Sequence, residues 1–487
     1  MLSQEQSITL IKEIVAGTGR GDFQKISGIP DSYTYEHLAA LFALKGQLDG
    51  GESFYRQVYH LAMARGEEHL RRKAGSGERI QVAFLTYSAA LWPAKNLYRD
   101  MEADERFHPY VIVPPRIGRD GTSIVTEYNQ TLQWFREKGF EVIGGLTDRI
   151  LGWNELGGVP DLVIHSASDY ECIPPEHNFL QLPWRCLNLY APGGLFLQEN
   201  SGHTYAKDII SDKDFFNMMW RICAGTEFER KQYEEYGLLQ GENVLSSGLL
   251  KADALWEKLM AKNGEAQDPD VASDTEWKYP EHADPSKCKR VIISPMGDLQ
   301  PESEESCDTF FENAFFWIYL AKKYQDSVTF LFRPHPDLRY MTVKGGLFAS
   351  HEAYDAYLEQ WNSLPNARVM SDPEEADAFR SSDVMITDDV SCAGEYLVTR
   401  KPVLYLTRPQ QKFNALGEKL LEATYRAPGK RYAEIERFLT EVVLNEQDTM
   451  QEQREAVCEE YLNYRSGIGK FAHEIVMEEI ERAISGM

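Results

Sequence analysis

The stretch Ser381–Leu406, SSDVMITDDVSCAGEYLVTRKPVLYL, decides the fold class of this 487-residue chain. The apolar run Val384–Ile386 predicts a buried strand, and a helical pattern begins at Ala393 after a polar turn. Pro402 ends this helix, and a second apolar run, Val403–Leu406, predicts the next strand. A strand, a helix and another strand in this order are typical of a parallel sheet that is covered by helices.

Short apolar runs alternate with helical patterns over most of the chain, which extends this interpretation to two sheets. A polar segment with three prolines, residues 261–289, separates the two series of runs and predicts a linker. We therefore expect an α/β protein with two Rossmann-like domains that face a cleft. The predicted strands are Val82–Leu85, Tyr110–Val113, Phe140–Ile143, Leu162–Ile164 and Cys186–Leu189, and then Val291–Ile293, Val328–Phe332, Arg368–Met370, Val384–Ile386 and Val403–Leu406.

Helical patterns without strand-like runs occupy both ends of the chain. Tyr33–Leu48 and Phe54–Leu70 are amphipathic, and the region after residue 429 is helical and charged. The predicted organisation is a helical extension at 1–78, a first Rossmann-like domain at 79–260, a linker at 261–289, a second Rossmann-like domain at 290–429 and helices at 430–487.

The chain is acidic, because 51 lysines and arginines face 76 aspartates and glutamates, for a net charge of −25. This balance argues against a nucleic acid as the main partner, since phosphate backbones are bound by basic surfaces. It also disfavours broad electrostatic adhesion to an anionic membrane, although local peripheral contact stays open. The sequence does not predict an oligomeric state.

No apolar run of about 18 residues is present, and the first residues lack the basic and apolar pattern of a signal peptide. The seven cysteines are scattered without a CxxC pair. This spacing is typical of free thiols in a reducing compartment rather than of disulfides or a zinc site. We therefore expect a cytoplasmic protein, with peripheral contact at the inner membrane face as an option. The sequence predicts no metal site and no cofactor.

The segment LFRPHPDL, residues 331–338, places Arg333 and His335 directly after the predicted strand Val328–Phe332. Open α/β sheets bind ligands at the carboxyl ends of their strands. Arginine supplies a permanent forked cation and histidine supplies a hydrogen bond or a proton, so the pair suits a phosphate. Two flanking prolines stiffen the turn. The alternative is a surface turn with a structural histidine.

The turn Thr387–Ser391 follows the predicted strand Val384–Ile386 and leads into a helix. Unpaired N–H groups at the start of a helix favour anions, and the hydroxyls of Thr387 and Ser391 would add donors. The alternative is a plain capping role for Ser391, with Glu395 completing the cap.

The segments RPHP and TDDVSCAGEYLVTRKPVLY together resemble the signature of the CDP-glycerol glycerophosphotransferases, which make teichoic-acid-type polymers and have a GT-B fold. Glu395 replaces the acid of the family pattern conservatively. Asp389, Val390 and Gly394 stand where the family has tyrosine, serine and phenylalanine. The positions that fit the pattern are Thr387, Asp388, Ser391, Tyr396, Lys401 and Pro402.

This resemblance implies transfer of glycerol phosphate or ribitol phosphate from a CDP-alditol to a hydroxyl of a cell-surface glycan or polymer precursor, with release of CMP. The partners would be this nucleotide-diphosphate donor and a glycan or polyol-phosphate acceptor, the acceptor being bound by the first domain. His335 would be catalytic, because it would stabilise charge on the transferred phosphoryl group. The implied donor-binding residues are Arg333, Thr387, Asp388, Ser391 and Glu395.

The family's His-Gly-Thr motif, which contains its catalytic base, is not intact, so the base has two candidates. His203 lies in Asn200–Thr204, the segment nearest to the motif, and His165 ends the predicted strand Leu162–Ile164. For each, a structural histidine is the alternative. Arg116 could bind an acceptor phosphate or lie in a solvated loop.

Two other functions stay open on the sequence alone. A GT-B glycosyltransferase that uses a nucleotide sugar would share the architecture and the anion-binding turn. A non-catalytic, nucleotide-sugar-binding assembly protein would account for the incomplete motif and for Val390. The product separates the enzymes, since one releases CMP and the other a nucleoside diphosphate.

Overall fold

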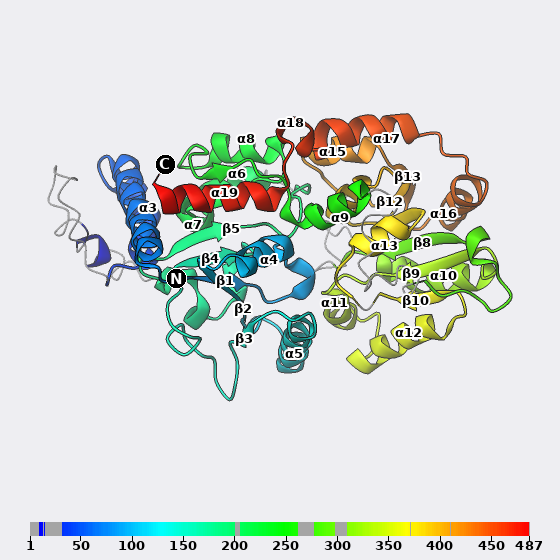
Figure 1. The fold of residues 1–487 in the computed structure, drawn as a ribbon. Coiled ribbons are helices and arrows are strands. Elements are labelled where there is room, and N and C mark those ends of the chain that lie inside the picture. The colour runs from blue at the N-terminus through cyan, green and yellow to red at the C-terminus, as the bar shows by residue number, and fades with distance from the viewer. Residues whose placement is uncertain are drawn as a thin grey trace. The chain divides into compact units, whose positions relative to one another are not determined.

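The structure is a computed structural model of the chain. It describes residues 9–12, 14, 32–199, 205–261, 277–297, 309–370, 372–409 and 411–486. The chain divides into two compact units (Figure 1). The first unit extends to Gly193, resumes over Ala206–Lys251 and is completed by the last residues from Gly469. The second unit consists of Ala252–Ile468 and a short segment that starts at Gly194.

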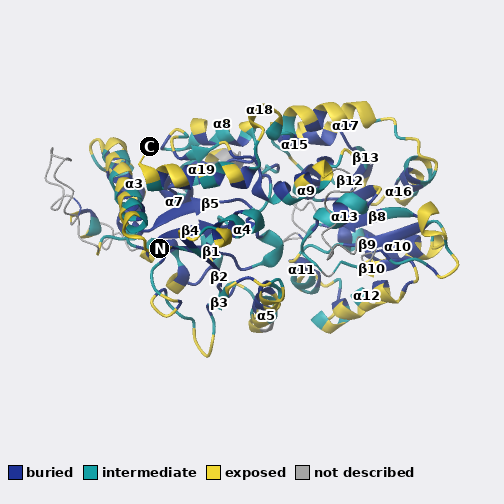
Figure 2. Cartoon of the chain, in the orientation of Figure 1, coloured by how far each residue is buried: buried dark blue, intermediate teal, exposed yellow. Residues whose placement is uncertain are grey.

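The first unit contains a parallel sheet whose described strands follow the order β3-β2-β1-β4-β5-β6-β7. The sheet grows outward from β1, with β2 on one side of this strand and β4 on the other. The central strands are almost fully buried, which explains their continuous apolar runs (Figure 2). The strands are β1 (Ile80–Leu85), β2 (Phe107–Val113), β3 (Val142–Gly144), β4 (Leu162–His165), β5 (Leu187–Tyr190), β6 (Arg221–Cys223) and β7 (Val244–Leu245).

Helices pack around this sheet, and the longest of them, α3, approaches β5 closely. A Cβ atom on Gly66 would lie 2.2 Å from Cδ2 of Leu187, so a larger residue would displace the leucine side chain. The last helix of the chain, α19, packs on α3 and α4 of the same unit. The helices are α2 (Tyr35–Leu44), α3 (Gly51–Ser76), α4 (Lys95–Ala103), α5 (Gly121–Glu137), α6 (Tyr205–Asp212), α7 (Asp214–Met218), α8 (Glu227–Tyr236) and α19 (Ala472–Ser485), with α9 (Leu250–Met260) leading into the second unit.

The second unit contains another parallel sheet, with its described strands in the order β10-β9-β8-β11-β12-β13. In this sheet β8 is the first strand along the chain, and β9 and β11 pair with it on its two sides. Val291 and Ile293 of β8 belong to the buried core of this unit. The strands are β8 (Lys289–Ser294), β9 (Val328–Phe332), β10 (Ala367–Val369), β11 (Val384–Thr387), β12 (Val403–Thr407) and β13 (Tyr425–Pro428).

Aromatic side chains fix the helices of the second unit on the sheet. Phe332, the last residue of β9, stacks on Trp361 of α12 with ring centroids 4.9 Å apart. This contact anchors the strand end that precedes Arg333. The helices are α10 (Phe310–Lys323), α11 (Leu338–Lys344), α12 (His351–Ser363), α13 (Ala376–Ser381), α14 (Val390–Leu397), α15 (Ala415–Glu422), α16 (Tyr432–Phe438), α17 (Gln451–Val457) and α18 (Arg465–Ile468).

The predicted fold class, α/β with two Rossmann-like sheets and additional helices, is confirmed. In the structure α19 belongs to the first unit, and the segment that starts at Gly194 belongs to the second. The described ranges contain no helix that is long and apolar enough to cross a bilayer.

Candidate active site

The candidate site lies at the carboxyl edge of the sheet in the second unit. The loops after β8, β9 and β11 meet there, because β8 lies between the other two strands. This is a topological switch point, the position where open α/β sheets bind ligands. Ser294 ends β8, Arg333 follows β9, and Thr387 ends β11. The structure therefore brings together the residues that the sequence predicts for donor binding.

Arg333 is held in the site by an ion pair. Its Nη2 lies 2.6 Å from Oε2 of Glu375, and its Nη1 donates to Oγ of Ser294 at 2.9 Å. The side chains of Arg333 and Glu375 are only 14% and 6% exposed. Burial opposes the charged form of Arg333, but the neighbouring carboxylates, that of Glu375 first, raise its pKa above the ordinary value. The guanidinium is thus a fixed cation that links the ends of β8 and β9.

His335 lies in a turn that orients its imidazole ring. The backbone N–H of Asp337 donates to Nδ1 of His335 at 3.1 Å. A neutral imidazole that accepts at Nδ1 carries its proton at Nε2, so Nε2 is the atom that can donate to a ligand. Gly297, in the loop after β8, lies against this turn. A Cβ atom there would be 2.9 Å from N of Leu338 and 3.1 Å from Nδ1 of His335, so a larger residue would crowd the imidazole.

Thr387 and Asp388 form hydrogen bonds within the protein. Oγ1 of Thr387 donates to the carbonyl of Ser294 at 2.6 Å. Asp388 accepts from the N–H of Met296 at 2.7 Å, and from the N–H and hydroxyl of Thr309 at 2.5 and 2.8 Å. Burial raises the pKa of Asp388 to about 6 even though these hydrogen bonds favour the carboxylate. Asp388 therefore ties the loop after β8 to the start of α10, which is a supporting role beneath the site.

Asp389 caps the start of α14. Its Oδ1 accepts from the backbone N–H groups of Ser391 and Cys392 at 2.9 and 3.2 Å. An aspartate in this position satisfies N–H groups that have no partner inside the helix and complements the helix dipole. These are N–H groups of the predicted anion-binding turn, so a phosphate that bound them would have to replace Asp389.

The short segment that starts at Gly194 contacts the first turns of α14 in the second unit. Oγ of Ser391 donates to the carbonyl of Leu195 at 2.6 Å. Gly194 lies beside Glu395, since a Cβ atom on the glycine would be 3.0 Å from Oε1 of the glutamate. The expected alternative for Ser391, a helix cap completed by Glu395, is therefore not what the structure shows. Asp389 provides the cap, and the hydroxyl of Ser391 binds the segment that starts at Gly194.

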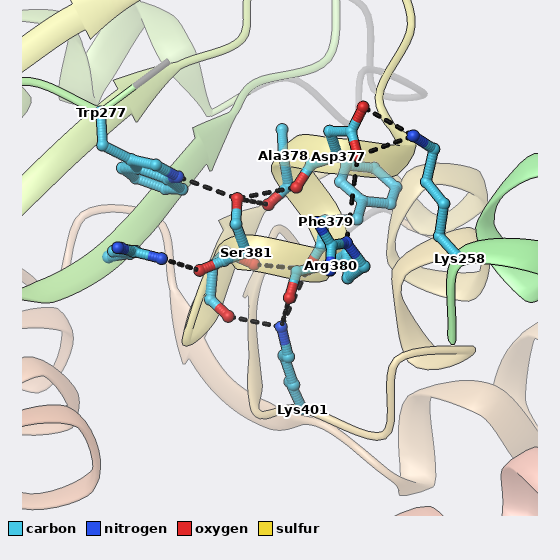
Figure 3. A network of polar contacts seen from close by, with 10 residues as sticks. Lys258, Trp277, Asp377, Ala378, Phe379, Arg380, Ser381 and Lys401 are labelled. Atoms are coloured by element: carbon cyan, nitrogen blue, oxygen red, sulfur yellow. Dashed lines mark hydrogen bonds and ion pairs between the residues drawn. The ribbon is translucent and has the colours of Figure 1, made fainter. Parts of the chain in front are cut away.

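Lys401, which fits the family pattern, holds the end of α13 (Figure 3). Burial lowers the pKa of Lys401 to about 8. A cation is favoured at this end of a helix, where the last carbonyls lack partners. Because Glu375 directly precedes α13, this contact also helps to place the partner of Arg333. The carbonyls that accept from Nζ of Lys401 are those of Phe379, Arg380 and Ser382, at 3.0, 2.6 and 2.5 Å.

The same helix is held by Lys258, which precedes the predicted linker, and by Trp277, which lies within it. Nζ of Lys258 binds the two carboxylate oxygens of Asp377, each at 2.7 Å, and Nε1 of Trp277 donates to Oγ of Ser381 at 2.9 Å (Figure 3). Trp277 is buried. The chain is therefore anchored on α13 before and after residues 262–276, which lie outside the described residues.

His165 is enclosed in the core of the first unit. Its Nε2 lies 2.9 Å from Oδ1 of Asn188, and the rings of Phe179 and Phe215 pack edge-on against the imidazole. Burial lowers the pKa of His165 to about 4, although the bond to Asn188 acts in the opposite direction. This geometry is typical of a structural histidine that is neutral at pH 7. His203, the other predicted base, lies outside the described residues.

Sequence reasoning missed Glu375 and Ser294, the two partners of Arg333. Ser294 directly follows an apolar run, and this position at the edge of a sheet is a signal that could have identified it. Glu375 belongs to the acidic stretch PEEAD and has no distinguishing signal. In the described parts of the chain, His, Cys, Asp and Glu side chains do not form a group of three or more that could hold a metal ion.

The fold and the position of the site define the class of protein: two parallel α/β sheets of GT-B type, with a charged site at the switch point of the second. Within this class, residues 303–480 match the model of the family CDP-glycerol:poly(glycerophosphate) glycerophosphotransferase. The resemblance indicated by the motifs is confirmed by this match.

Solved structures of the wall teichoic acid polymerase TagF have the same fold. A histidine-to-asparagine variant matches with a TM-score of 0.53 and 13% identity, covering 100% of this chain and 100% of that chain. A histidine-to-alanine variant matches with a TM-score of 0.52 and 12% identity, covering 99% of each chain. At these identities the likeness establishes the fold alone. A comparison with curated proteins found no match.

Proposed function

We propose that the protein transfers an alditol phosphate from a CDP-alditol to a hydroxyl of a glycan or polymer precursor, with release of CMP. The observation that carries this proposal is the RPHP turn at the switch point, within the segment that matches the glycerophosphotransferase family. There Nδ1 of His335 is fixed by Asp337, and Arg333 supplies a buried cation. Both features suit a substrate that contains a pyrophosphate.

The reaction is a displacement at phosphorus. The acceptor oxygen attacks the phosphorus that bears the alditol, and the bond from this phosphorus to the bridging oxygen breaks. CMP leaves with the bonding electrons, and the acceptor proton passes to a base. We assign the Nε2–H of His335 to a phosphoryl oxygen, where it would stabilise the charge that develops in the transition state. We keep His203 as the proposed base, because His165 is enclosed in a core.

We propose the following donor-binding roles. Arg333 would attract the pyrophosphate, and Glu395 would accept a hydrogen bond from a ribose hydroxyl. The N–H groups of Ser391 and Cys392 would bind phosphate only after Asp389 moves away from them. Thr387 and Asp388 would support the site from below without contacting the donor, given their hydrogen bonds to neighbouring loops.

Two measurements test the proposal. A thermal-shift screen of CDP-glycerol, CDP-ribitol and common nucleotide sugars reports the preferred nucleotide, because a ligand at 100 times its Kd stabilises the folded state by about 2.7 kcal/mol. Incubation with CDP-glycerol and a polyol-phosphate acceptor should then release CMP. Stabilisation by a nucleotide sugar together with release of a nucleoside diphosphate would show a glycosyltransferase. Stabilisation by a nucleotide sugar without turnover would show a binding protein.

A further inference from the structure

A second group of polar side chains lies at the carboxyl edge of the sheet in the first unit. Tyr87 follows β1, Arg116 follows β2 and Asp169 follows β4. These strands are neighbours, and the strand order reverses between β2 and β4 on the two sides of β1 (Figure 1). The loops after β1 and β4 therefore flank the switch point of this sheet. The candidate active site lies at the corresponding switch point of the sheet in the second unit.

Tyr87 and Asp169 connect the two loops at this switch point. The hydroxyl of Tyr87 lies 3.1 Å from Oδ1 and 2.9 Å from Oδ2 of Asp169, so the phenol donates to the carboxylate. Burial and the charge of Asp169 raise the pKa of Tyr87, which keeps the phenol protonated as a donor. A carboxylate has about four lone-pair positions, and the phenol and the neighbouring Cys172 thiol supply one proton each. Asp169 thus keeps the capacity to accept from hydroxyl groups of a ligand.

Arg116 and Cys172 complete the group. The guanidinium carbon of Arg116 lies 4.8 Å from the ring centroid of Tyr87, which is a cation–π contact. The backbone N–H of Ile117 donates to the carbonyl of Cys172 at 2.9 Å, and this bond fixes the loop after β2 against the loop after β4. A cation and a carboxylate are therefore held against one buried aromatic ring by three loops. Arg116 is partly buried in this cluster rather than lying in a solvated loop.

We propose that Arg116, Tyr87 and Asp169 form a binding site for a phosphorylated polyol. The guanidinium of Arg116 would bind the phosphate, for which its planar fork is suited. The carboxylate of Asp169 would accept hydrogen bonds from the polyol hydroxyls, with Tyr87 holding the carboxylate in place. This inference rests on the proposed function in one respect, namely that the ligand is the acceptor of the transfer reaction.

The test uses the full chain and measures binding without turnover. sn-Glycerol 3-phosphate, inorganic phosphate and glycerol are titrated separately by isothermal titration calorimetry, together with CDP-glycerol as a report on the second unit. We expect Arg116→Gln and Asp169→Asn to weaken binding of glycerol 3-phosphate about tenfold or more, since each removes a charge-assisted hydrogen bond. Arg116→Lys keeps the charge without the fork and should weaken binding less.

Arg99 provides the matched control. Its guanidinium also lies over an aromatic ring of the first unit, 4.2 Å from the centroid of Phe140, but that ring precedes β3 and so lies toward the opposite edge of the sheet. Arg99→Gln should leave the affinity for glycerol 3-phosphate unchanged. Circular dichroism of each variant confirms that it is folded.

The outcomes separate this inference from the proposed function. Loss of glycerol 3-phosphate binding in Arg116→Gln but not in Arg99→Gln supports the site even when CDP-glycerol does not bind at all. Normal binding in folded Arg116→Gln and Asp169→Asn overturns the site even when CDP-glycerol is turned over. Inorganic phosphate that binds as tightly as glycerol 3-phosphate also overturns it, because the polyol would then not be recognised.

Discussion

Oε2 of Glu375 lies 2.6 Å from Nη2 of Arg333, so the arginine proposed to bind the donor is paired with a carboxylate of its own chain. Glu375→Gln should lower the melting temperature, because it leaves a buried cation without its counter-charge at a cost of about 3–5 kcal/mol. The same change should tighten binding of CDP-glycerol, since the phosphates no longer compete with Glu375. Calorimetry and thermal melts check both effects. The neighbouring Glu374→Gln keeps the ion pair and serves as the control, and weaker donor binding in Glu375→Gln would contradict the assignment.

Asp389 competes with phosphate for the N–H groups at the start of α14 in the same way. Asp389→Ser keeps a good N-cap residue and removes the negative charge, so the melting temperature should change little while the affinity for CDP-glycerol rises. Asp389→Ala removes the cap as well and should cost about 1 kcal/mol of stability. Unfolding in denaturant and titration with CDP-glycerol measure the two quantities. An unchanged or lower affinity in Asp389→Ser would show that the phosphates bind elsewhere.

His335 has two ring nitrogens with different tasks, and two variants separate them. His335→Ala should lower kcat about 10²–10³-fold, as expected for loss of a donor to the transition state. His335→Asn can still accept from the N–H of Asp337 but lacks the donor at the position of Nε2. It should therefore fold normally and lose the same activity. A folded His335→Asn protein with normal turnover would rule out the catalytic role.

His165 should make the first unit sensitive to acid. Its pKa falls from 6.5 to about 4 on folding, so the unfolded state binds more protons between these values and stability falls as pH drops through this window. The full effect amounts to about 3 kcal/mol, at 1.36 kcal/mol per pKa unit. Denaturant unfolding from pH 7 to pH 4 should show a smaller loss in His165→Gln than in the natural protein. Equal losses would mean that the histidine is solvated.

Lys401 should act on stability and not on chemistry. Lys401→Met leaves three carbonyls at the end of α13 without a charged donor and should cost about 2 kcal/mol. Because folding lowers the pKa of Lys401 from 10.5 to about 8, the unfolded state binds more protons between these values. The natural protein should therefore gain stability relative to Lys401→Met as pH rises from 8 toward 10. Denaturant midpoints across this range provide the measurement, and parallel pH profiles would count against the pKa shift.

Much of the fold could be predicted from apolar runs alone, because the central strands of both sheets are buried on both faces. The exceptions are β6, β7 and β13, which lie at or next to one edge of each sheet. β7 contains only Val244 and Leu245, and Tyr425–Pro428 ends in a proline, so neither has the continuous apolar pattern on which the prediction depends. These strands form because a neighbouring strand already offers unpaired backbone groups.

The sequence could predict which loops form the site, but not which side chains pair within it. The RPHP turn and the segment after β11 could be placed at a sheet edge, since each directly follows a buried run. The pairing of Arg333 with Glu375 could not be predicted, because it depends on how α13 is placed against β9 in the folded chain. The cap on α14 is Asp389, whereas the sequence suggests a cap only as the alternative role of Ser391, two residues later; either residue type can cap a helix.

The return of α19 to the first unit has a consequence for how the protein is made. Glu479 of this helix lies 2.6 Å from Arg221, and Glu481 lies 2.7 Å from Arg106, so the helix closes contacts with residues translated far earlier. A ribosome that has finished the first unit's sheet still has the whole of the second unit to synthesise before it reaches α19. The first unit therefore stays incomplete until α19 has been translated. A nascent chain arrested after the second unit would expose the surfaces of α3 and α4 that α19 covers, and would be a substrate for chaperones and proteases.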